Sequence, residues 1–318
     1  MSDPKQPEFP PASPAPPSLG EELDELQSST TVQELEMASS VTAALISETL
    51  ASTPAPLAGE PDNPPPPPFI DFDRVSITFG DRKVLDEVSF HLGRGQTLCI
   101  LGRSGVGKSV SLRILLGFLK ADSGCVRVDG QDISSLDERG LQEIRKHVTM
   151  VFQNGALFDS LTVGENIAFP LREKGGLFED QIQQLVSRLL DLVGASDTVN
   201  LLPSSLSTGQ KRCIAIARAL AAQPEAILYD EPTTMVDPIM SDILAQLMLK
   251  LKHDLKLTAV VVTHDLDLMR RVADKVVVLF EGRAIYFGPV KDLEKSDHPH
   301  IRAFLAMDRV ELVPGAVE

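Results

Sequence analysis

Residues 102–109 read G-R-S-G-V-G-K-S, which matches the phosphate-binding pattern G-x-x-x-x-G-K-[S/T]. Three glycines let the backbone curl until successive N–H groups point at one anion. The lysine can then reach the β- and γ-phosphates of a nucleotide, and the serine hydroxyl can hold Mg²⁺. The residues expected at this site are Gly102, Arg103, Ser104, Gly105, Val106, Gly107, Lys108 and Ser109, followed by Val110.

The segments on either side of this loop have the character that the motif requires. Residues 96–101 form a short apolar run that predicts a buried parallel strand, and residues 110–116 carry apolar side chains at helical spacing. A helix that begins at the loop adds the partial positive charge of its N-terminus. A chance match in a glycine-rich turn is the alternative, and the flanking pattern argues against it. We therefore expect a nucleotide site.

A second apolar strand, predicted at residues 226–229, ends in two carboxylates, Asp230 and Glu231. A carboxylate in this position can support Mg²⁺ beside bound phosphates, usually through water, and we assign this role to Asp230. Glu231 is placed to orient and polarise an attacking water. Two carboxylates after a strand are often only a solvated strand end, but the phosphate loop upstream favours the functional interpretation.

Four further segments fit the same chemistry. Gln153 follows the predicted strand 147–152 and could sense Mg²⁺ and the water, while Asp237 follows the paired carboxylates after a short loop. His264 follows the predicted strand 258–263, at the carboxyl edge where open α/β sheets bind ligands. Each is weak alone, because a lone Gln or His at a strand end is usually structural. The fourth segment opens a helix and offers its hydroxyl and N–H groups to an anion: Ser207, Thr208, Gly209 and Gln210.

Strands alternate with helices through the body of the chain, which predicts an α/β fold with a mainly parallel sheet. No internal repeat is found, so one nucleotide site is expected per chain. Strands are expected at 70–78, 84–92, 96–101, 125–128, 147–152, 226–229, 258–263, 275–280 and 283–287, and helices at 110–116, 137–145, 179–193, 207–222, 238–254 and from 266 onward.

The motifs, in this order, resemble those of the ABC ATPase family over residues 69 to about 290. The resemblance implies a P-loop NTPase fold with an antiparallel β subdomain, a helical subdomain near 155–222, and ATP with Mg²⁺ as cofactors. It places Phe79 on the adenine and His264 on the γ-phosphate, and it makes Glu231 the base or water-positioning group. Thr208 replaces the first glycine of the family's L-S-G-G-Q segment.

The resemblance also implies a homodimer that encloses two ATP molecules head to tail. In that arrangement the loop carrying Lys108 faces the segment Ser207–Gln210 of the second copy. Asp237 is expected among the residues that bind the nucleotide. Metal contacts are expected from Ser109, Gln153 and Asp230.

Residues 153–173 are similar to those of the ATPases of Mla/MCE lipid transporters. This resemblance implies phospholipid transport between membranes, with integral-membrane permease subunits and an MCE-domain lipid-binding protein on separate chains, at the cytoplasmic face of the cell membrane. Four apolar residues in or near this stretch could grip a permease helix or could only fill the helical subdomain: Ala156, Leu157, Phe158 and Phe169. The alternative function is the ATPase of a small-solute ABC importer. A soluble ABC protein of DNA repair or translation is a further alternative. Such proteins commonly carry tandem sites or long coiled-coil inserts, and this sequence shows neither.

Composition divides the 318 residues into an extension and a body. Residues 1–68 hold 15 of the 23 prolines and, with 11 acidic residues and one basic residue, carry a charge of −10, so about −5 of the total −15 falls on the rest. We expect a disordered Pro-rich extension at 1–68, with a solvated or partner-docking helix near 21–50, an ATPase domain at 69–307 and a tail at 308–318. The mildly acidic body argues against a nucleic-acid surface.

The three cysteines, Cys99, Cys125 and Cys213, are far apart and lie in apolar or helical patterns, so buried thiols in a reducing compartment are expected. The first residues lack the basic start and apolar stretch of a signal peptide. No apolar run approaches the ~18 residues that span a bilayer, so any membrane span would come from other subunits.

Overall fold

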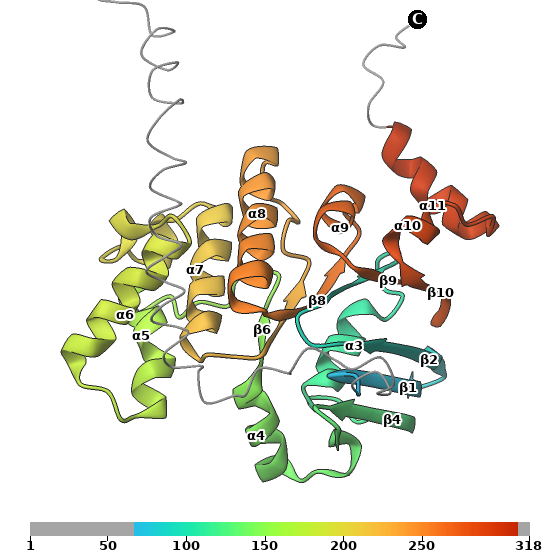
Figure 1. Ribbon diagram of the computed structural model, residues 1–318, viewed down its shortest axis with the longest axis horizontal. Helices are drawn as coiled ribbons and strands as arrows, with labels where there is room; N and C mark the ends of the chain where they lie inside the picture. Colours follow the sequence, from blue (N-terminus) through green and yellow to red (C-terminus); the bar gives the residue numbers. More distant parts are fainter. Residues whose placement is uncertain (1–66, 311–318) are drawn as a thin grey trace, which may run out of the picture. The chain divides into compact units, whose positions relative to one another are not determined.

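The computed structural model describes residues 67–310 (Figure 1). The predicted helix at 21–50, the Pro-rich segments before residue 67 and residues 311–318 lie outside the described residues. The first strand of the described residues begins at Ile70, one residue after the expected boundary at residue 69.

A six-stranded sheet forms the centre of the fold, in the order β10-β9-β3-β8-β7-β6. Five of the strands are parallel, and only β10 runs antiparallel, beside β9. Every residue of β3, β7 and β8 is buried, which explains why these strands read as continuous apolar runs. The strands span β3 Thr97–Leu101, β6 Val148–Val151, β7 Ala226–Asp230, β8 Thr258–Thr263, β9 Lys275–Phe280 and β10 Arg283–Pro289. The predicted α/β class is confirmed.

An antiparallel sheet, β2-β1-β4-β5, makes a second layer. Its alternating apolar residues face inward, and the rings of Phe72 and Phe90 stack there with centroids 4.6 Å apart. The bounds are β1 Ile70–Phe79, β2 Arg82–Leu92, β4 Ser123–Val128 and β5 Gln131–Asp132. The antiparallel subdomain implied by the resemblance is therefore present.

The central sheet divides the apolar core into two clusters, because neighbouring residues of a strand point to opposite faces. Cys99 and Leu101 of β3 join one cluster, and Leu98 and Ile100 join the other. The helices outside the bundle described below are α3 Lys108–Leu115, α4 Glu138–His147, α8 Pro238–Leu255, α9 Leu266–Val272, α10 Val290–Leu293 and α11 Pro299–Val310. Among the described residues, no helix combines the length and hydropathy needed to cross a bilayer.

Three helices, α5 Val163–Lys174, α6 Glu179–Leu192 and α7 Thr208–Ala221, pack side by side in the green and yellow part of Figure 1. Capping boxes begin α5 at Thr162 and α7 at Ser207. This bundle lies within the range 155–222 expected for the helical subdomain.

The structure also contains elements that were not expected individually, namely β5, α5, α10 and α11, and some element ends differ. β6 ends at Val151, so Phe152 and Gln153 lie in the turn that follows it. α11 continues to Val310, three residues beyond the expected domain end at 307. Cys99 and Cys213 are buried as predicted, and burial raises the pKa of the Cys213 thiol to about 11. Cys125 is only half-buried.

Candidate nucleotide site

A cavity of about 1070 Å³ opens at the carboxyl edge of the central sheet. Its walls include most of the predicted phosphate loop, Phe79 from β1, Gln153, Glu231 and His264. The loop residues in the wall are Gly102, Arg103, Ser104, Gly105, Gly107, Lys108, Ser109 and Val110, whereas Val106 packs against the core cluster behind them. The structure thus brings together, in the wall of one cavity, residues that are far apart in the sequence.

Gly107 shows why the loop needs glycine. Its φ is +110°, and a Cβ at this position would lie 2.6 Å from Leu85 Cδ2 and 3.0 Å from the carbonyl oxygen of Val84. Only glycine fits both the backbone angle and the contact with β2. α3 begins at the next residue, Lys108, so its N-terminal end faces the cavity.

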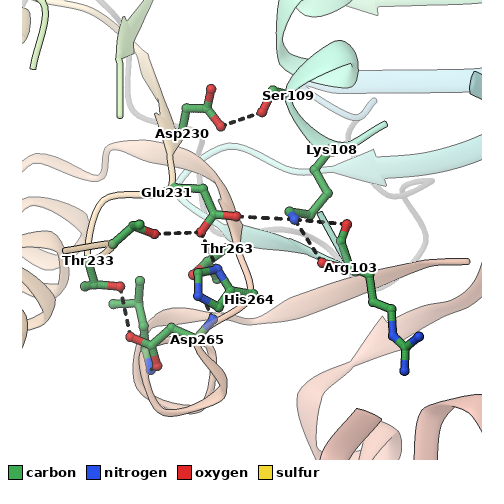
Figure 2. A network of polar contacts seen from close by, with 12 residues as sticks. Arg103, Lys108, Ser109, Asp230, Glu231, Thr233, Thr263, His264 and Asp265 are labelled. Carbon is green, nitrogen blue, oxygen red and sulfur yellow. Dashed lines mark hydrogen bonds and ion pairs between the residues drawn. The ribbon is translucent and has the colours of Figure 1, made fainter. Parts of the chain in front are cut away.

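Lys108 is 7% exposed and its ammonium group is fully engaged (Figure 2). Nζ donates hydrogen bonds to the carbonyl oxygens of Gly102 at 2.8 Å and Arg103 at 3.3 Å, and it lies 3.3 Å from Glu231 Oε1. The loop therefore holds the cation at the point where phosphate oxygens would gather.

Ser109 and Asp230 supply an oxygen pair at the other side of the loop. Ser109 Oγ donates to Asp230 Oδ1 at 2.8 Å. Burial raises the pKa of Asp230, and the neighbouring Glu231 charge acts in the same direction, against the hydrogen bond from Ser109. A hydroxyl and a carboxylate at this separation are ligands of the kind that Mg²⁺ prefers, so the two residues fit such an ion.

Glu231 connects the two halves of the site. Its second oxygen lies 2.8 Å from His264 Nδ1 and accepts a hydrogen bond from Thr234 Oγ1 at 3.2 Å. The backbone of Glu231 has a φ of +50°, and its N–H donates to the carbonyl of Val262 on β8. This turn after β7 aims the carboxylate into the cavity.

Neighbouring polar residues fix the loop that carries His264. Asp265 caps α9 by accepting from the N–H of Leu268 at 2.9 Å, and its other oxygen accepts from Thr233 Oγ1 at 2.9 Å. Its own N–H donates to Thr263 Oγ1 at 3.0 Å. Figure 2 shows this set beside Glu231, so the β7 and β8 ends are held together by side chains.

The remaining predicted residues lie outside the cavity wall. Ser207 and Thr208 are exposed at the N-terminal end of α7, and Gly209 is buried, with Met240 so near that a Cβ on Gly209 would lie 2.9 Å from its Cε and Cγ. Asp237 is exposed and caps α8 by accepting from the N–H of Met240 at 3.0 Å. Within the described part of one chain, the segment 207–210 therefore does not meet the phosphate loop.

Sequence reasoning did not single out several residues in the wall of the cavity, among them Arg82, Thr233 and Phe304. Arg82 donates from Nη2 to the carbonyl of Gly105 at 3.0 Å and so supports the phosphate loop from β2. Thr233 and Phe304, the latter from α11, also line the cavity. These positions carry no local motif, and only the folded topology brings them to the site.

A family model described as "ABC transporter" matches residues 85–234. The ATP-binding protein MlaF of an intermembrane phospholipid transport system is 36% identical over 237 residues, which is 74% of this chain and 90% of the Haemophilus influenzae protein. The Escherichia coli K12 protein is also 36% identical, and the match covers 88% of that protein's length. The chain belongs to the ATP-binding proteins of ABC transporters.

The chain is also similar to an ATP-binding protein of a different transport system and to solved cassette structures. The methionine import ATP-binding protein MetN of Brucella abortus is 40% identical over 223 residues, and the match spans only 60% of that protein's length. Among solved structures, the dimeric cassette MJ0796 in a post-hydrolysis state with ADP and Pi has a TM-score of 0.65 and 30% identity, covering 70% of this chain and 98% of that one. A cbiO1 structure from Clostridium perfringens has a TM-score of 0.67 and 28% identity, covering 76% and 100%. The chain is an ATPase with the fold of these cassettes.

Proposed function

We propose that this ATPase powers phospholipid transport between membranes, together with separate permease and MCE-domain subunits. The observation that carries the proposal is the stretch 153–173, which is similar to that of Mla-type ATPases and folds into a turn and helix with an exposed aromatic pair. The extent of the MlaF match supports it, since it covers nearly the whole relative. Methionine or other small-solute import is the second candidate, favoured by the higher identity to MetN.

The residues of the cavity have complementary roles in this proposal. Phe79, 47% exposed, stacks on the adenine, and Lys108 with the loop N–H groups binds the phosphates. Bound Mg²⁺, held through Ser109 and Asp230, would neutralise phosphate charge. Glu231 accepts the proton of the attacking water or orients it, and His264 holds Glu231 in place and reaches the γ-phosphate. Gln153 also lines the cavity, where it would sense Mg²⁺ and the water.

A second copy of the chain would complete the site. The N-terminal end of α7 is exposed and its first turn offers N–H groups and the Ser207 hydroxyl to an anion, yet it lies outside the cavity of its own chain. The relative MJ0796 is described as dimeric. We therefore propose a homodimer with two-fold symmetry, in which Ser207, Thr208, Gly209 and Gln210 of one protomer face the phosphate loop of the other.

The permease would dock on the helical bundle beside the sheet. Phe158 and Phe169 are 44% and 45% exposed, and their ring centroids lie 5.0 Å apart. Asn166, fully buried, holds Phe158 by accepting from its N–H at 2.8 Å and donating to its carbonyl at 3.1 Å. A rigid, exposed aromatic pair suits the apolar face of a partner helix. The ATPase would then lie peripherally at the cytoplasmic face of the membrane.

Affinity purification of the tagged chain from its native membrane, followed by mass spectrometry, tests the assignment. We expect a permease and an MCE-domain protein, and we expect both to disappear with the variant Phe158→Ser/Phe169→Ser. The variant Phe118→Ser, at another exposed aromatic, is the control and should keep both partners. Recovery of a methionine or sugar permease without an MCE-domain protein would overturn the phospholipid assignment and leave the ATPase assignment standing.

A further inference from the structure

Helix α7 carries a buried arginine that the site chemistry does not use. The Arg212 side chain is 3% exposed. Its Nη1 donates to the carbonyl of Phe152 at 3.0 Å, while its buried Nε has no hydrogen-bond partner among the described residues. The nearby Asp230 carboxylate acts on it only through its electrostatic field.

Such an arrangement is unfavourable for stability. A buried cation that lacks an ion-pair partner loses its hydration without full compensation, and the unpaired Nε adds to that loss. Burial accordingly lowers the pKa of the Arg212 guanidinium. An apolar side chain of similar length would fill the same space at lower cost, so packing alone does not account for an arginine here.

The residue that Arg212 holds directly precedes Gln153. Farther along the same helix, Arg218 donates to the carbonyl of Ala156 at 2.8 Å and to that of Gly155 at 3.4 Å. Gly155 also lies close to α7, since a Cβ on it would meet the Lys211 carbonyl oxygen at 3.3 Å. The turn 152–156 is therefore clamped to α7 by two arginines and a close backbone approach.

We propose that Arg212 is a positioning residue for ATP hydrolysis. By holding the Phe152 carbonyl, it fixes Gln153 in the wall of the nucleotide cavity at a set distance from the N-terminal end of α7. The helix α7 thus sets the position of Gln153 in the cavity of its own chain. The same helix also carries Ser207–Gln210, which would face the second protomer. The inference rests on the proposed role of Gln153.

Steady-state ATPase measurements on the full-length chain test it with five variants: Arg212→Met, Arg212→Lys, Gln153→Ala, the double variant Arg212→Met/Gln153→Ala, and Arg188→Met as a half-buried arginine control on α6. For Arg212→Met we expect kcat about tenfold lower with KM within about twofold, because the loss concerns the transition state and not nucleotide binding. Arg212→Lys keeps a cationic donor, and its kcat should lie about threefold below that of the wild type. Arg188→Met should match the wild type.

The double variant decides between positioning and plain stability. If Arg212 acts through Gln153, the double variant has the kcat of Gln153→Ala alone, because the position of a side chain that is already removed cannot affect the rate. Thermal melting should show Arg212→Met at least as stable as the wild type. Multiplied losses, a wild-type kcat for Arg212→Met, or a fall in kcat matched by a fall in Tm would overturn the inference. A wild-type kcat for Gln153→Ala, with Arg212→Met still impaired, would overturn the role of Gln153 and place the effect of Arg212 elsewhere.

Discussion

Lys108 Nζ lies 3.3 Å from Glu231 Oε1, so the cation that should bind phosphate is paired with the carboxylate that should activate water. The two residues come from a loop after β3 and a turn after β7, strands that β8 separates in the sheet. An incoming triphosphate must compete with Glu231 for the same ammonium group. Lys108 therefore links two events: when its ammonium group binds the nucleotide, Glu231 becomes free to interact with the attacking water.

The first prediction concerns Glu231→Gln. The amide cannot accept a proton from water, and it no longer neutralises Lys108. We expect hydrolysis to fall by about 10²-fold or more, the size of a general-base contribution. ATP should bind at least as tightly as in the wild type, and the dimer should be trapped. Phosphate release and equilibrium binding of a fluorescent nucleotide measure the two effects, with the surface variant Glu143→Gln as control. Normal steady-state turnover would remove Glu231 from the catalytic role.

Lys108→Ala should have the opposite profile. It removes the charge that faces the phosphates and leaves Glu231 without its lysine partner. Nucleotide affinity should fall by about 10²-fold, since a charge-assisted contact of this kind contributes ~2–3 kcal/mol. The same binding assay checks this, with Lys146→Ala on the surface of α4 as control. Unchanged affinity would show that the loop N–H groups suffice.

The variant Asp230→Asn tests how much the buried negative charge of Asp230 destabilises the fold. Because burial raises the pKa of Asp230, its ionised form destabilises the fold at neutral pH, and the neutral amide removes that effect. Tm should rise in Asp230→Asn at pH 7, by about 2–4 °C for each kcal/mol regained. The difference in Tm between Asp230→Asn and the wild type should shrink as the pH falls through the raised pKa of Asp230 toward the ordinary Asp value of ~3.9. In that range the wild-type carboxyl takes up a proton and loses the charge that destabilises it. Melting curves across this range decide it, and a pH-independent Tm difference would contradict it.

Gly209→Ala should displace the start of α7. Its Cβ would meet Met240 Cε and Cγ at 2.9 Å, and such overpacking typically costs about 1–3 kcal/mol. ATPase activity should fall, and Met240→Ala in the same chain should restore part of it by removing two of the three close contacts. Activity and Tm of both variants check the pairing. Equal loss with and without Met240→Ala would point to a direct need for glycine at the dimer interface.

Much of the fold followed from local pattern. β3, β7 and β8 are buried on both faces and so read as unbroken apolar runs, and α6 and α7 show clear helical spacing. The phosphate loop and His264 could be placed because each stands directly beside such a strand. Arg212 and Arg218 could not, because an arginine in an amphipathic helix normally lies in solvent. Their targets are carbonyl groups 60 or more positions earlier in the chain, and no local spacing encodes that pairing.

The left-handed backbone at Glu231, with φ at +50°, has a consequence for protein engineering. A non-glycine residue in this region is strained by about 1–2 kcal/mol, and a glycine would relax it. Glycine would also remove the carboxylate that lies 3.3 Å from the buried Lys108 ammonium, so the relief of backbone strain would be offset by an uncompensated cation and accompanied by the loss of catalysis. Relieving this strain is therefore not a route to a more stable ATPase, because the strained residue is also the one that neutralises Lys108.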